Sequence, residues 1–173
     1  AVGYVMPAAT DTVSLDALFA DTNPTSKAAS FADRVFVAGV LSLLVLQIHR
    51  TGAIIGDFNP ANIRLRQVST AERWTLHIID TDSFQIRIGS KVMTTNIGKD
   101  EYSSPRLINL RLAKMKNDSS ARNLGWMGLE RVRADDEYAL AVIIFRILLS
   151  AHPMQAKPGK GSTPDNIVGG VFP

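Results

Sequence analysis

The sequence contains no cysteine among its 173 residues. That absence excludes disulfide bonds, zinc sites built on thiolates and a cysteine nucleophile, and it fits a reducing compartment, so we expect a cytoplasmic protein. Excess charge is also small, because 19 Lys and Arg against 16 Asp and Glu leave a net charge of +3, spread along the chain. A charge this weak and diffuse argues against a nucleic-acid partner.

Long hydrophobic runs are missing as well. The longest, 35–46, is interrupted by Gly39 and Ser42 and is shorter than the roughly 20 residues that a membrane-spanning helix needs. No charged stretch precedes a short apolar segment at the start, so no signal peptide is predicted. The sequence therefore predicts no membrane partner.

Two apolar helices are predicted instead. Ser30 is a favourable N-cap for a helix over 31–49. The apolar residues of that helix cover most of its circumference, which predicts burial on several sides. A second apolar helix starts at residue 135 or 136 and ends near 151, because Pro153 cannot continue it.

Short strands are predicted between these helices, at 53–55, 63–68, 75–79 and 84–88. A short helix over 15–20 precedes them. The rest reads as irregular chain, with a turn at 89–90, no regular pattern over 91–134, and polar loops at 114–122 and 155–166. These elements predict an α+β fold whose strands are too short and too local for a doubly wound sheet.

Polar residues gather at the strand ends. Asp57 and Asn62 lie in the loop before one predicted strand, and Asp80 directly follows the next. This set suits phosphoryl transfer, in which one carboxylate orients an attacking hydroxyl while a second carboxylate and an amide oxygen hold Mg²⁺ against the phosphates.

Several motifs in this order resemble the protein kinase family. They correspond to the hinge between the two kinase lobes at 3–7, the D-x-x-x-x-N catalytic loop at 57–62, D-F-G at 80–82, the segment ending in A-P-E at 102–106, the central buried helix at 136–142 and the G-x-P-F loop at 151–154. The resemblance covers nearly the whole chain. It implies the mainly helical C-terminal lobe of a divergent bacterial Ser/Thr protein kinase-like protein, with short β-hairpins.

The resemblance implies a role for each matching residue. Asp57 is expected to be the catalytic base, with Asn59 in the catalytic loop beside it. Asn62 and Asp80 are expected to hold Mg²⁺, and Asp82 is either a further metal ligand or a turn residue. ATP and Mg²⁺ are the implied cofactors.

Two further roles follow from the same resemblance. Asp136 is expected to support the catalytic loop, to cap its own helix, or to do both. Tyr4, Val5 and Met6 are expected to contact the nucleotide at the hinge.

Besides Asp82, which stands where the family has the Gly of D-F-G, the sequence departs from the family pattern at four positions. Ile55 and Gly56 replace the His and Arg of the catalytic loop, which implies that an active protein needs no phosphorylated activation loop. Asn59 stands where the family has a lysine and cannot supply its charge. Arg106 replaces the Glu of A-P-E, so the usual ion pair cannot form with the usual sign.

The family's Gly-rich loop and strand lysine are absent from this sequence. We therefore expect the N-terminal lobe elsewhere in the same gene product, and we expect this stretch to be inactive by itself. The implied organisation is a single partial domain over 1–173, with a hinge at 1–7, an activation-segment-like stretch at 80–106 and an insertion at 107–134.

The leading hypothesis is an ATP-dependent Ser/Thr protein kinase-like phosphotransferase that meets a protein substrate or a regulatory protein. Two alternatives remain open. One is a small-molecule kinase of the aminoglycoside or choline kinase type, and the other is a pseudokinase scaffold. His49 and His152 lack metal-ligand spacing and are interpreted as a helix-end residue and a loop residue.

Overall fold

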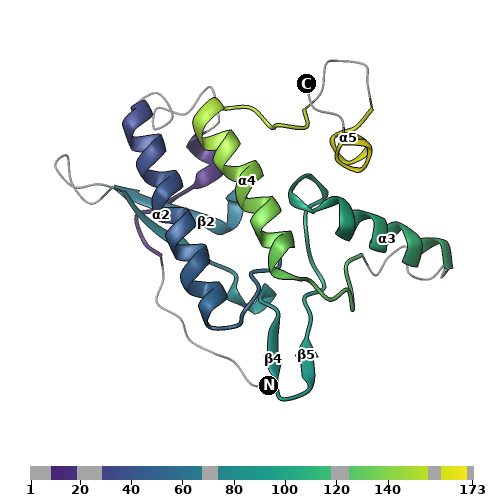
Figure 1. Cartoon of the computed structure of the whole chain (residues 1–173). Helices are drawn as coiled ribbons and strands as arrows, with labels where there is room; N and C mark the ends of the chain where they lie inside the picture. The colour runs from purple at the N-terminus through teal and green to yellow at the C-terminus, as the bar shows by residue number, and fades with distance from the viewer. Residues whose placement is uncertain (1–8, 19–28, 68–73, 118–124, 156–160, 171–173) are drawn as a thin grey trace.

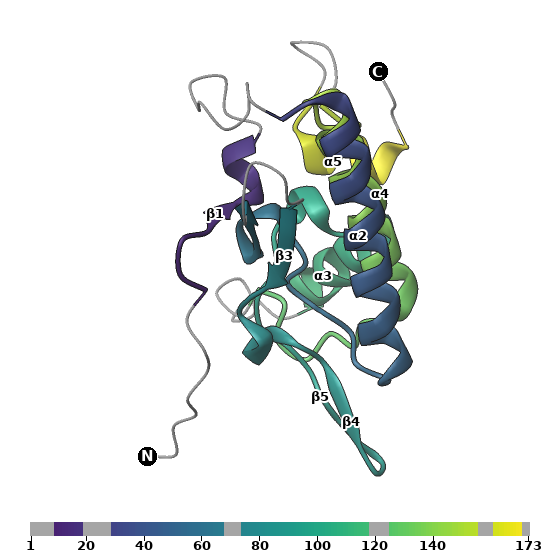
Figure 2. The ribbon, with the colours of Figure 1, turned by 90° about the vertical axis from the view of Figure 1, so that its left-hand side faces the viewer.

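Two long helices lie side by side in the computed structural model, as Figure 1 and Figure 2 show. The structure describes residues 9–18, 29–67, 74–117, 125–155 and 161–170. Helix α2 spans Phe31–Arg50 and begins at the predicted cap, where Ser30 Oγ accepts a hydrogen bond from the Asp33 N–H at 3.2 Å. Helix α4 spans Arg133–Leu149 and ends before Pro153, as predicted.

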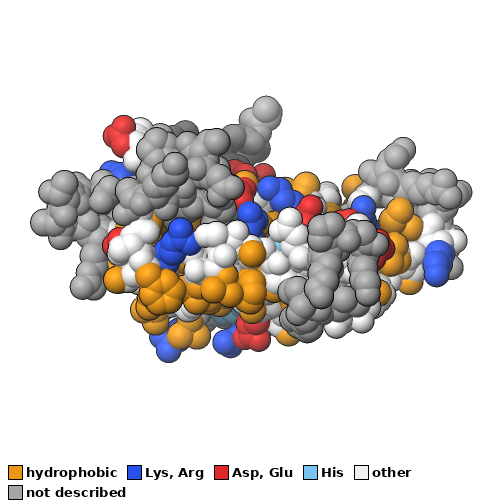
Figure 3. All heavy atoms as spheres, turned by 90° about the horizontal axis from the view of Figure 1, so that it is seen from above, with side chains coloured by type: hydrophobic (Ala, Val, Ile, Leu, Met, Phe, Trp, Pro, Cys, Tyr) orange, Lys and Arg blue, Asp and Glu red, His pale blue; other side chains and the backbone are white. Residues whose placement is uncertain are grey.

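Helix α2 buries one stripe rather than several sides, contrary to the expectation from its composition. Its buried residues, Val37, Ala38, Leu41 and Val45, are spaced at helical intervals along one face. The side chains of Phe31 and Leu43 are 66% and 62% exposed. Figure 3 looks onto the end where α2 begins and α4 ends, and hydrophobic side chains gather along one side of that view.

By length and composition alone, α2 is the one helix of the described residues that is long and apolar enough to cross a membrane. A core helix of a soluble protein passes the same test. In this fold α2 packs on α4, and the Arg34 guanidinium donates to the carbonyl oxygen of Ile147 at 3.2 Å.

A three-stranded antiparallel sheet lies along one side of the helix pair (Figure 2). Its strand order is β1 (Val13–Ser14), β2 (Ile63–Gln67), β3 (Trp74–Ile78). The pairing of β2 with β3 is the predicted hairpin, with Ile63 opposite Ile78. Inward residues of β2 and the buried stripe of α2 form the main hydrophobic core, together with apolar residues of α4.

A second hairpin, β4 (Ile86–Ile88) with β5 (Lys91–Met93), projects from the body of the molecule (Figure 1). Its turn contains Gly89 at φ +59°, as the predicted turn at 89–90 requires. Strand β5 corrects the expectation that regular structure stops at residue 91. The predicted strand at 53–55 is reduced to one bridge, between Ile54 and Gln85.

Two further helices were not predicted. Helix α3 (Pro105–Asn117) overturns the irregular assignment, and its start is fixed by Pro105 and by the Leu107 N–H, which donates to Ser104 Oγ at 3.2 Å. Helix α5 (Thr163–Gly169) overturns the loop assigned there. The expected helix over 15–20 is a 3₁₀ turn, η1 (Leu15–Leu18). Helices and small antiparallel sheets together confirm the α+β class.

Candidate active site

Asp136 anchors the backbone of the loop that carries the candidate catalytic residues. Its carboxylate is 2% exposed and accepts hydrogen bonds from the Ile55 N–H at 2.8 Å and the Gly56 N–H at 3.3 Å. His49 Nε2 lies 2.8 Å from the same carboxylate. One buried carboxylate thus joins the end of α2 to the loop and to the first turn of α4. The cap interaction of α4 belongs to Asp135, whose carboxylate accepts the Val132 N–H at 2.8 Å.

Asp57 and Asn62, which the sequence places five residues apart, are in contact. The Asn62 side-chain amide donates to the Asp57 carboxylate and to the Asp57 carbonyl oxygen, both at 3.0 Å. The second carboxylate oxygen of Asp57 is buried without a hydrogen-bond partner among the described residues. Both of these hydrogen bonds use the amide nitrogen of Asn62, so neither of them occupies its Oδ1 atom.

Asn59 has a different environment from the one its predicted catalytic role requires. The residue is fully buried, its amide donates to the Asp57 carbonyl oxygen at 3.0 Å, and its Oδ1 accepts the Ala61 N–H at 3.1 Å. Both polar ends of the side chain are therefore used inside the loop. This geometry favours a structural role for Asn59 over a contact with substrate.

Asp80 lies at the same end of the β2–β3 hairpin as Asn62, because the Ile79 N–H donates to the Asn62 carbonyl oxygen at 2.9 Å. Asp80 is exposed and has a left-handed backbone with φ +57° and ψ +46°. Non-glycine residues adopt this conformation infrequently, and strained backbone concentrates at functional sites. Asp82 follows in a 3₁₀ turn, η3 (Thr81–Ser83), and is also exposed.

The donor set suits magnesium chemically. Mg²⁺ is usually held by one or two carboxylates together with substrate phosphates and waters, rather than by a complete cage of protein ligands. The Asn62 amide oxygen and the Asp80 carboxylate supply hard oxygen atoms of that kind. In the described part of the chain, no group of three or more His, Cys, Asp or Glu side chains could hold a metal ion.

Gly56 is where the loop passes closest to the segment after Asp80. Its φ is +83°, and a Cβ atom built on it would lie 2.3 Å from the Ser83 carbonyl oxygen and 3.1 Å from Nη1 of Arg131. Only glycine accepts both the backbone conformation and the close approach. The sequence identified Gly56 as a departure from the kinase pattern without giving this reason.

Arg131 is the most prominent residue of the site that sequence reasoning missed. Its side chain is buried beside the loop that contains Gly56 and Asp57, although the residue stands far along the chain. Burial lowers the pKa of the Arg131 guanidinium, and the nearby carboxylate of Asp57 opposes that shift, as do those of Asp136 and Asp135. No local pattern marks this arginine.

Asp135 is a second residue that the sequence interpreted only as a helix start. Its buried carboxylate accepts the Ser104 hydroxyl at 2.5 Å and the Arg106 Nε–H at 3.2 Å, and it forms an ion pair with the Arg106 guanidinium. Arg106 thus forms an ion pair of reversed sign, which the sequence did not anticipate. This pair connects the start of α3 to the start of α4.

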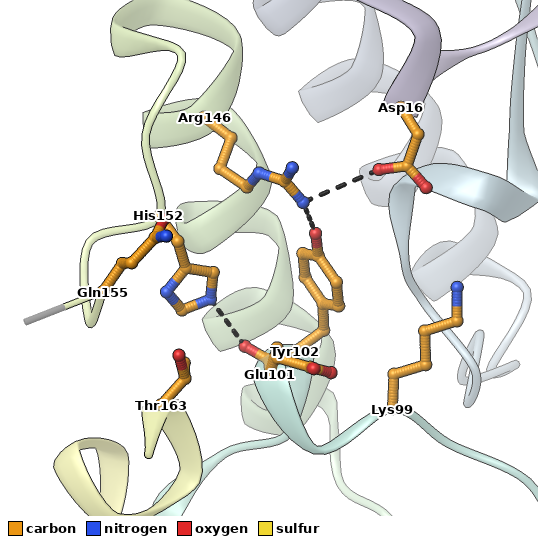
Figure 4. A pocket seen from close by; sticks show the side chains of 8 residues that line it. All are labelled: Asp16, Lys99, Glu101, Tyr102, Arg146, His152, Gln155 and Thr163. Carbon is orange, nitrogen blue, oxygen red and sulfur yellow. Dashed lines mark hydrogen bonds and ion pairs between the residues drawn. The ribbon is translucent and has the colours of Figure 1, made fainter. Parts of the chain in front are cut away.

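A polar hollow of about 330 Å³ opens beside the segment 99–106 (Figure 4). Figure 4 shows Arg146 of α4 reaching the hydroxyl of Tyr102 and the carboxylate of Asp16, which lies 3.6 Å away. Lys99 and Glu101 also line the hollow, so both signs of charge are present. Such a lining suits a polar side chain better than an apolar ligand.

His152, at the edge of the hollow, lies in the loop after α4, as predicted, and its side chain is buried. Its Nδ1 accepts the Met154 N–H at 3.0 Å, and its Nε2 lies 2.9 Å from the Glu101 carbonyl oxygen (Figure 4). These partners fix the neutral ring with its proton on Nε2. Burial is the main cause that lowers the pKa of His152.

The predicted hinge residues Tyr4, Val5 and Met6 lie outside the described residues. The same holds for the whole stretch 1–7 in the expected domain division and for part of the expected insertion at 107–134. These assignments stay predictions.

Comparison with known proteins finds kinase-like relatives. The chain is 25% identical over 125 residues to Protein kinase YegI of Escherichia coli strain K12 and to the protein of the same name from Escherichia coli O157:H7. The match covers 72% of this chain but only 16% and 17% of the two relatives, so the chain spans about one sixth of their length. No family model matches the chain. This distant similarity agrees with the kinase-like resemblance of the motifs.

Proposed function

We propose that the chain carries the catalytic loop of an ATP-dependent, kinase-like phosphotransferase. The observation that supports this most is the contact of the Asp57 carboxylate with the Asn62 amide at 3.0 Å. Asp80 stands at the end of the strand beside Asn62. The order and spacing of these three residues match the phosphoryl-transfer pattern, and the relatives named above are protein kinases by name.

Asp57 acts as the general base in this proposal. It accepts the proton of the substrate hydroxyl while the hydroxyl oxygen attacks the γ-phosphorus of ATP and the bond to ADP breaks. Asn62 holds the carboxylate through its amide, and Asp136 holds the backbone of the preceding residues. Since Asp136 is itself buried and paired with His49, the loop is preorganised before the substrate binds.

The Asn62 Oδ1 atom and the Asp80 carboxylate are the proposed Mg²⁺ ligands, with Asp82 close by in sequence. A bound Mg²⁺ ion neutralises charge on the β- and γ-phosphates. Asp80 has a left-handed backbone and an exposed side chain, two residues after β3 at the open end of the hairpin. Asn59 keeps the role of shaping the loop.

The proposed acceptor is a Ser or Thr hydroxyl of a protein. The polar hollow beside residues 99–106, with its side chains of both signs, supports a peptide-like ligand. We also propose that the nucleotide meets Tyr4, Val5 and Met6, and that the lobe covering the phosphates belongs to the same gene product. A small-molecule acceptor of the aminoglycoside or choline type is the alternative for the same site.

The test uses the complete gene product and follows transfer of labelled γ-phosphate. Replacement Asp57→Asn is expected to lower the transfer rate by about 10²–10⁴-fold, the usual contribution of a general base, while the affinity for Mg-ATP stays within about threefold. Glu137→Gln is the matched control, because Glu137 is exposed on α4 next to Asp136. Transfer at the wild-type rate by Asp57→Asn contradicts the proposal. Protein, amino-alcohol and aminoglycoside acceptors, tested in parallel, identify the acceptor class.

A non-catalytic nucleotide-binding scaffold is the second candidate, and Asn59 favours it. The loop offers no cation at this position, and the buried amide cannot reach out to replace one. A thermal shift with Mg-ATP in the absence of any phosphate transfer supports the scaffold. Transfer that depends on Asp57 excludes it.

A further inference from the structure

A single buried arginine lies where the catalytic loop, the segment 94–98 and the start of α4 meet. Arg131 is 2% exposed, and its Nη1 atom is 3.1 Å from the point where a Cβ of Gly56 would stand. On the other side, Nη2 is 2.7 Å from the corresponding point of Gly98. Two glycines therefore leave the room that the guanidinium fills.

The backbone of Arg131 is fixed to the same loop through Gln85. The Gln85 side chain donates to the Arg131 carbonyl oxygen at 2.7 Å and accepts the Arg131 N–H at 2.8 Å. The Gln85 backbone in turn exchanges two hydrogen bonds with Ile54, at 2.9 and 2.8 Å. Arg131 is thus joined to Gln85 by two hydrogen bonds, and Gln85 is joined to Ile54 by two more. Ile54 belongs to the stretch that leads into Asp57.

The guanidinium also holds the segment 94–98. Its Nη2 donates to the Ile97 carbonyl oxygen at 2.7 Å, and its Cζ lies 5.7 Å from the centre of the Trp126 ring. Trp126 Nε1 donates to the Gly98 carbonyl oxygen at 2.8 Å. The Arg131 guanidinium, the Trp126 indole and the segment 94–98 therefore form one connected unit next to the catalytic loop.

The remaining polar atoms of Arg131 are short of partners. Its Nε and Nη1 are buried with no hydrogen bond among the described residues, and so is one carboxylate oxygen of Asp57. Buried polar atoms without partners are costly and rare in native proteins, so each calls for an explanation. Here the two unpartnered groups carry opposite charges, and their attraction in a buried environment offsets part of that cost.

We infer that Arg131 is a positioning residue of the site, which supplies positive charge to Asp57 and ties the segment 94–98 to the catalytic loop without any phosphate group. The inference rests on the proposed function and adds its regulation. The loop has glycine at position 56 and cannot carry a side-chain cation there, so the charge comes from residue 131. The segment 94–98 is then already in place in the protein without phosphorylation.

The test compares Arg131→Met with Arg111→Met in the complete gene product. Arg111 is a matched control, because its Cζ also lies over the Trp126 ring, at 4.8 Å, and it pairs with Asp100 away from the loop. We expect Arg131→Met to lower kcat by about 10–100-fold, the cost of a misplaced catalytic group, with the Kd for Mg-ATP nearly unchanged. Arg111→Met is expected to keep kcat within about twofold of wild type.

A second measurement does not depend on activity. Hydrogen exchange followed by mass spectrometry is expected to show faster exchange over 94–98 in Arg131→Met than in wild type or Arg111→Met. If Arg131→Met does not fold, Arg131→Lys replaces it, because lysine keeps the charge but loses the fork of donors, and an intermediate kcat is expected. Guanidinium chloride below denaturing concentration is expected to restore part of the rate of Arg131→Ala.

The outcomes separate the inference from the proposed function. If Arg131→Met keeps both the wild-type kcat and wild-type exchange over 94–98, the inference is wrong while the proposed function stands. If the wild-type protein transfers no phosphate, the proposed function fails, and unchanged exchange would then overturn the structural part of the inference as well. Loss of stability with an unchanged kcat assigns Arg131 a purely structural role and overturns the positioning role.

Discussion

The Arg106 guanidinium and the Asp135 carboxylate form an ion pair that fixes the start of α3 against the start of α4. The carboxylate is 3% exposed and also accepts the Ser104 hydroxyl and the Val132 N–H, whereas the arginine side chain is 42% exposed. The two partners therefore differ in burial and in the number of their other hydrogen bonds. Removing the carboxylate leaves buried donors unpaired, and removing the arginine leaves a carboxylate with two other partners.

From this inequality we predict that Asp135→Ala lowers the free energy of unfolding by about 2–4 kcal/mol. Arg106→Ala is expected to cost about 1 kcal/mol, because its half-exposed charge was already hydrated. Urea denaturation of the variants measures both values. Arg87→Ala serves as control, since its pair with Glu130 is more than half exposed on both sides and should contribute less than about 1 kcal/mol. Equal costs for Asp135→Ala and Arg106→Ala would contradict the prediction.

The close approach at Gly56 predicts that alanine substitution costs much more stability there than at Gly52, a glycine with the same φ. Gly52 and Gly56 both have φ +83°, but a Cβ on Gly52 meets nothing within 4 Å. Gly52→Ala is expected to cost about 1 kcal/mol for the backbone alone. Gly56→Ala adds a clash with the Ser83 carbonyl oxygen and is expected to cost about 2–4 kcal/mol. Thermal or chemical unfolding that ranks the two variants equally would show that the loop can move away.

The burial of Asn59 predicts a cost in stability rather than in chemistry alone. Asn59→Ala removes the cap on the Ala61 N–H and a bond to the Asp57 carbonyl oxygen, so we expect a loss of about 1–3 kcal/mol. Asn96→Ala, at an exposed position, is expected to stay within about 0.5 kcal/mol of wild type. If Asn59→Ala lost activity with unchanged stability, Asn59 would contact the substrate after all.

The environment of His152 predicts how stability depends on pH. Its pKa is lowered in the folded state from an ordinary 6.5, mainly by burial, so below that pH the unfolded chain binds more protons than the folded one. The stability that neutral His152 contributes is fully present above about pH 6.5 and is lost as the pH falls, by at most about 1.4 kcal/mol per pH unit. His152→Gln is expected to be less stable at pH 7.5 but to lose less on acidification to pH 5. Parallel pH profiles for both proteins would refute this.

Local signals account for the parts of the fold that the sequence predicts correctly. The Ser30 cap, the apolar composition of α2 and the proline after α4 act within a few residues, and the β2–β3 hairpin joins neighbouring strands. Helix α3 was missed because it mixes polar and apolar residues, and its two buried residues, Leu107 and Ile108, find their partners on distant segments. The exposed apolar face of α2 was missed because composition cannot tell which sides of a helix are covered.

The same distinction holds for the candidate site. Asp57 and Asn62, which spacing alone grouped, are in contact, and Asp80 follows the strand beside Asn62. Arg131 carries no local signal, since it reaches the loop through Gln85 and the packing of Trp126. The sequence gives one indirect indication. Gly56 replaces the arginine of the kinase catalytic loop, so a positive charge near this loop would have to come from another residue.

The hydrogen bonds of Asp136 have a consequence for the order of events during synthesis. Asp136 is made 81 residues after Ile55, whose N–H it accepts. At about 5–20 residues per second, roughly 4–16 seconds pass on the ribosome between the two. A nascent chain that stops before Asp136 already contains every predicted base and metal ligand but lacks the carboxylate that holds them in place. The loop can therefore be held in this arrangement only after Asp136 has been made, which is later than every predicted base and metal ligand.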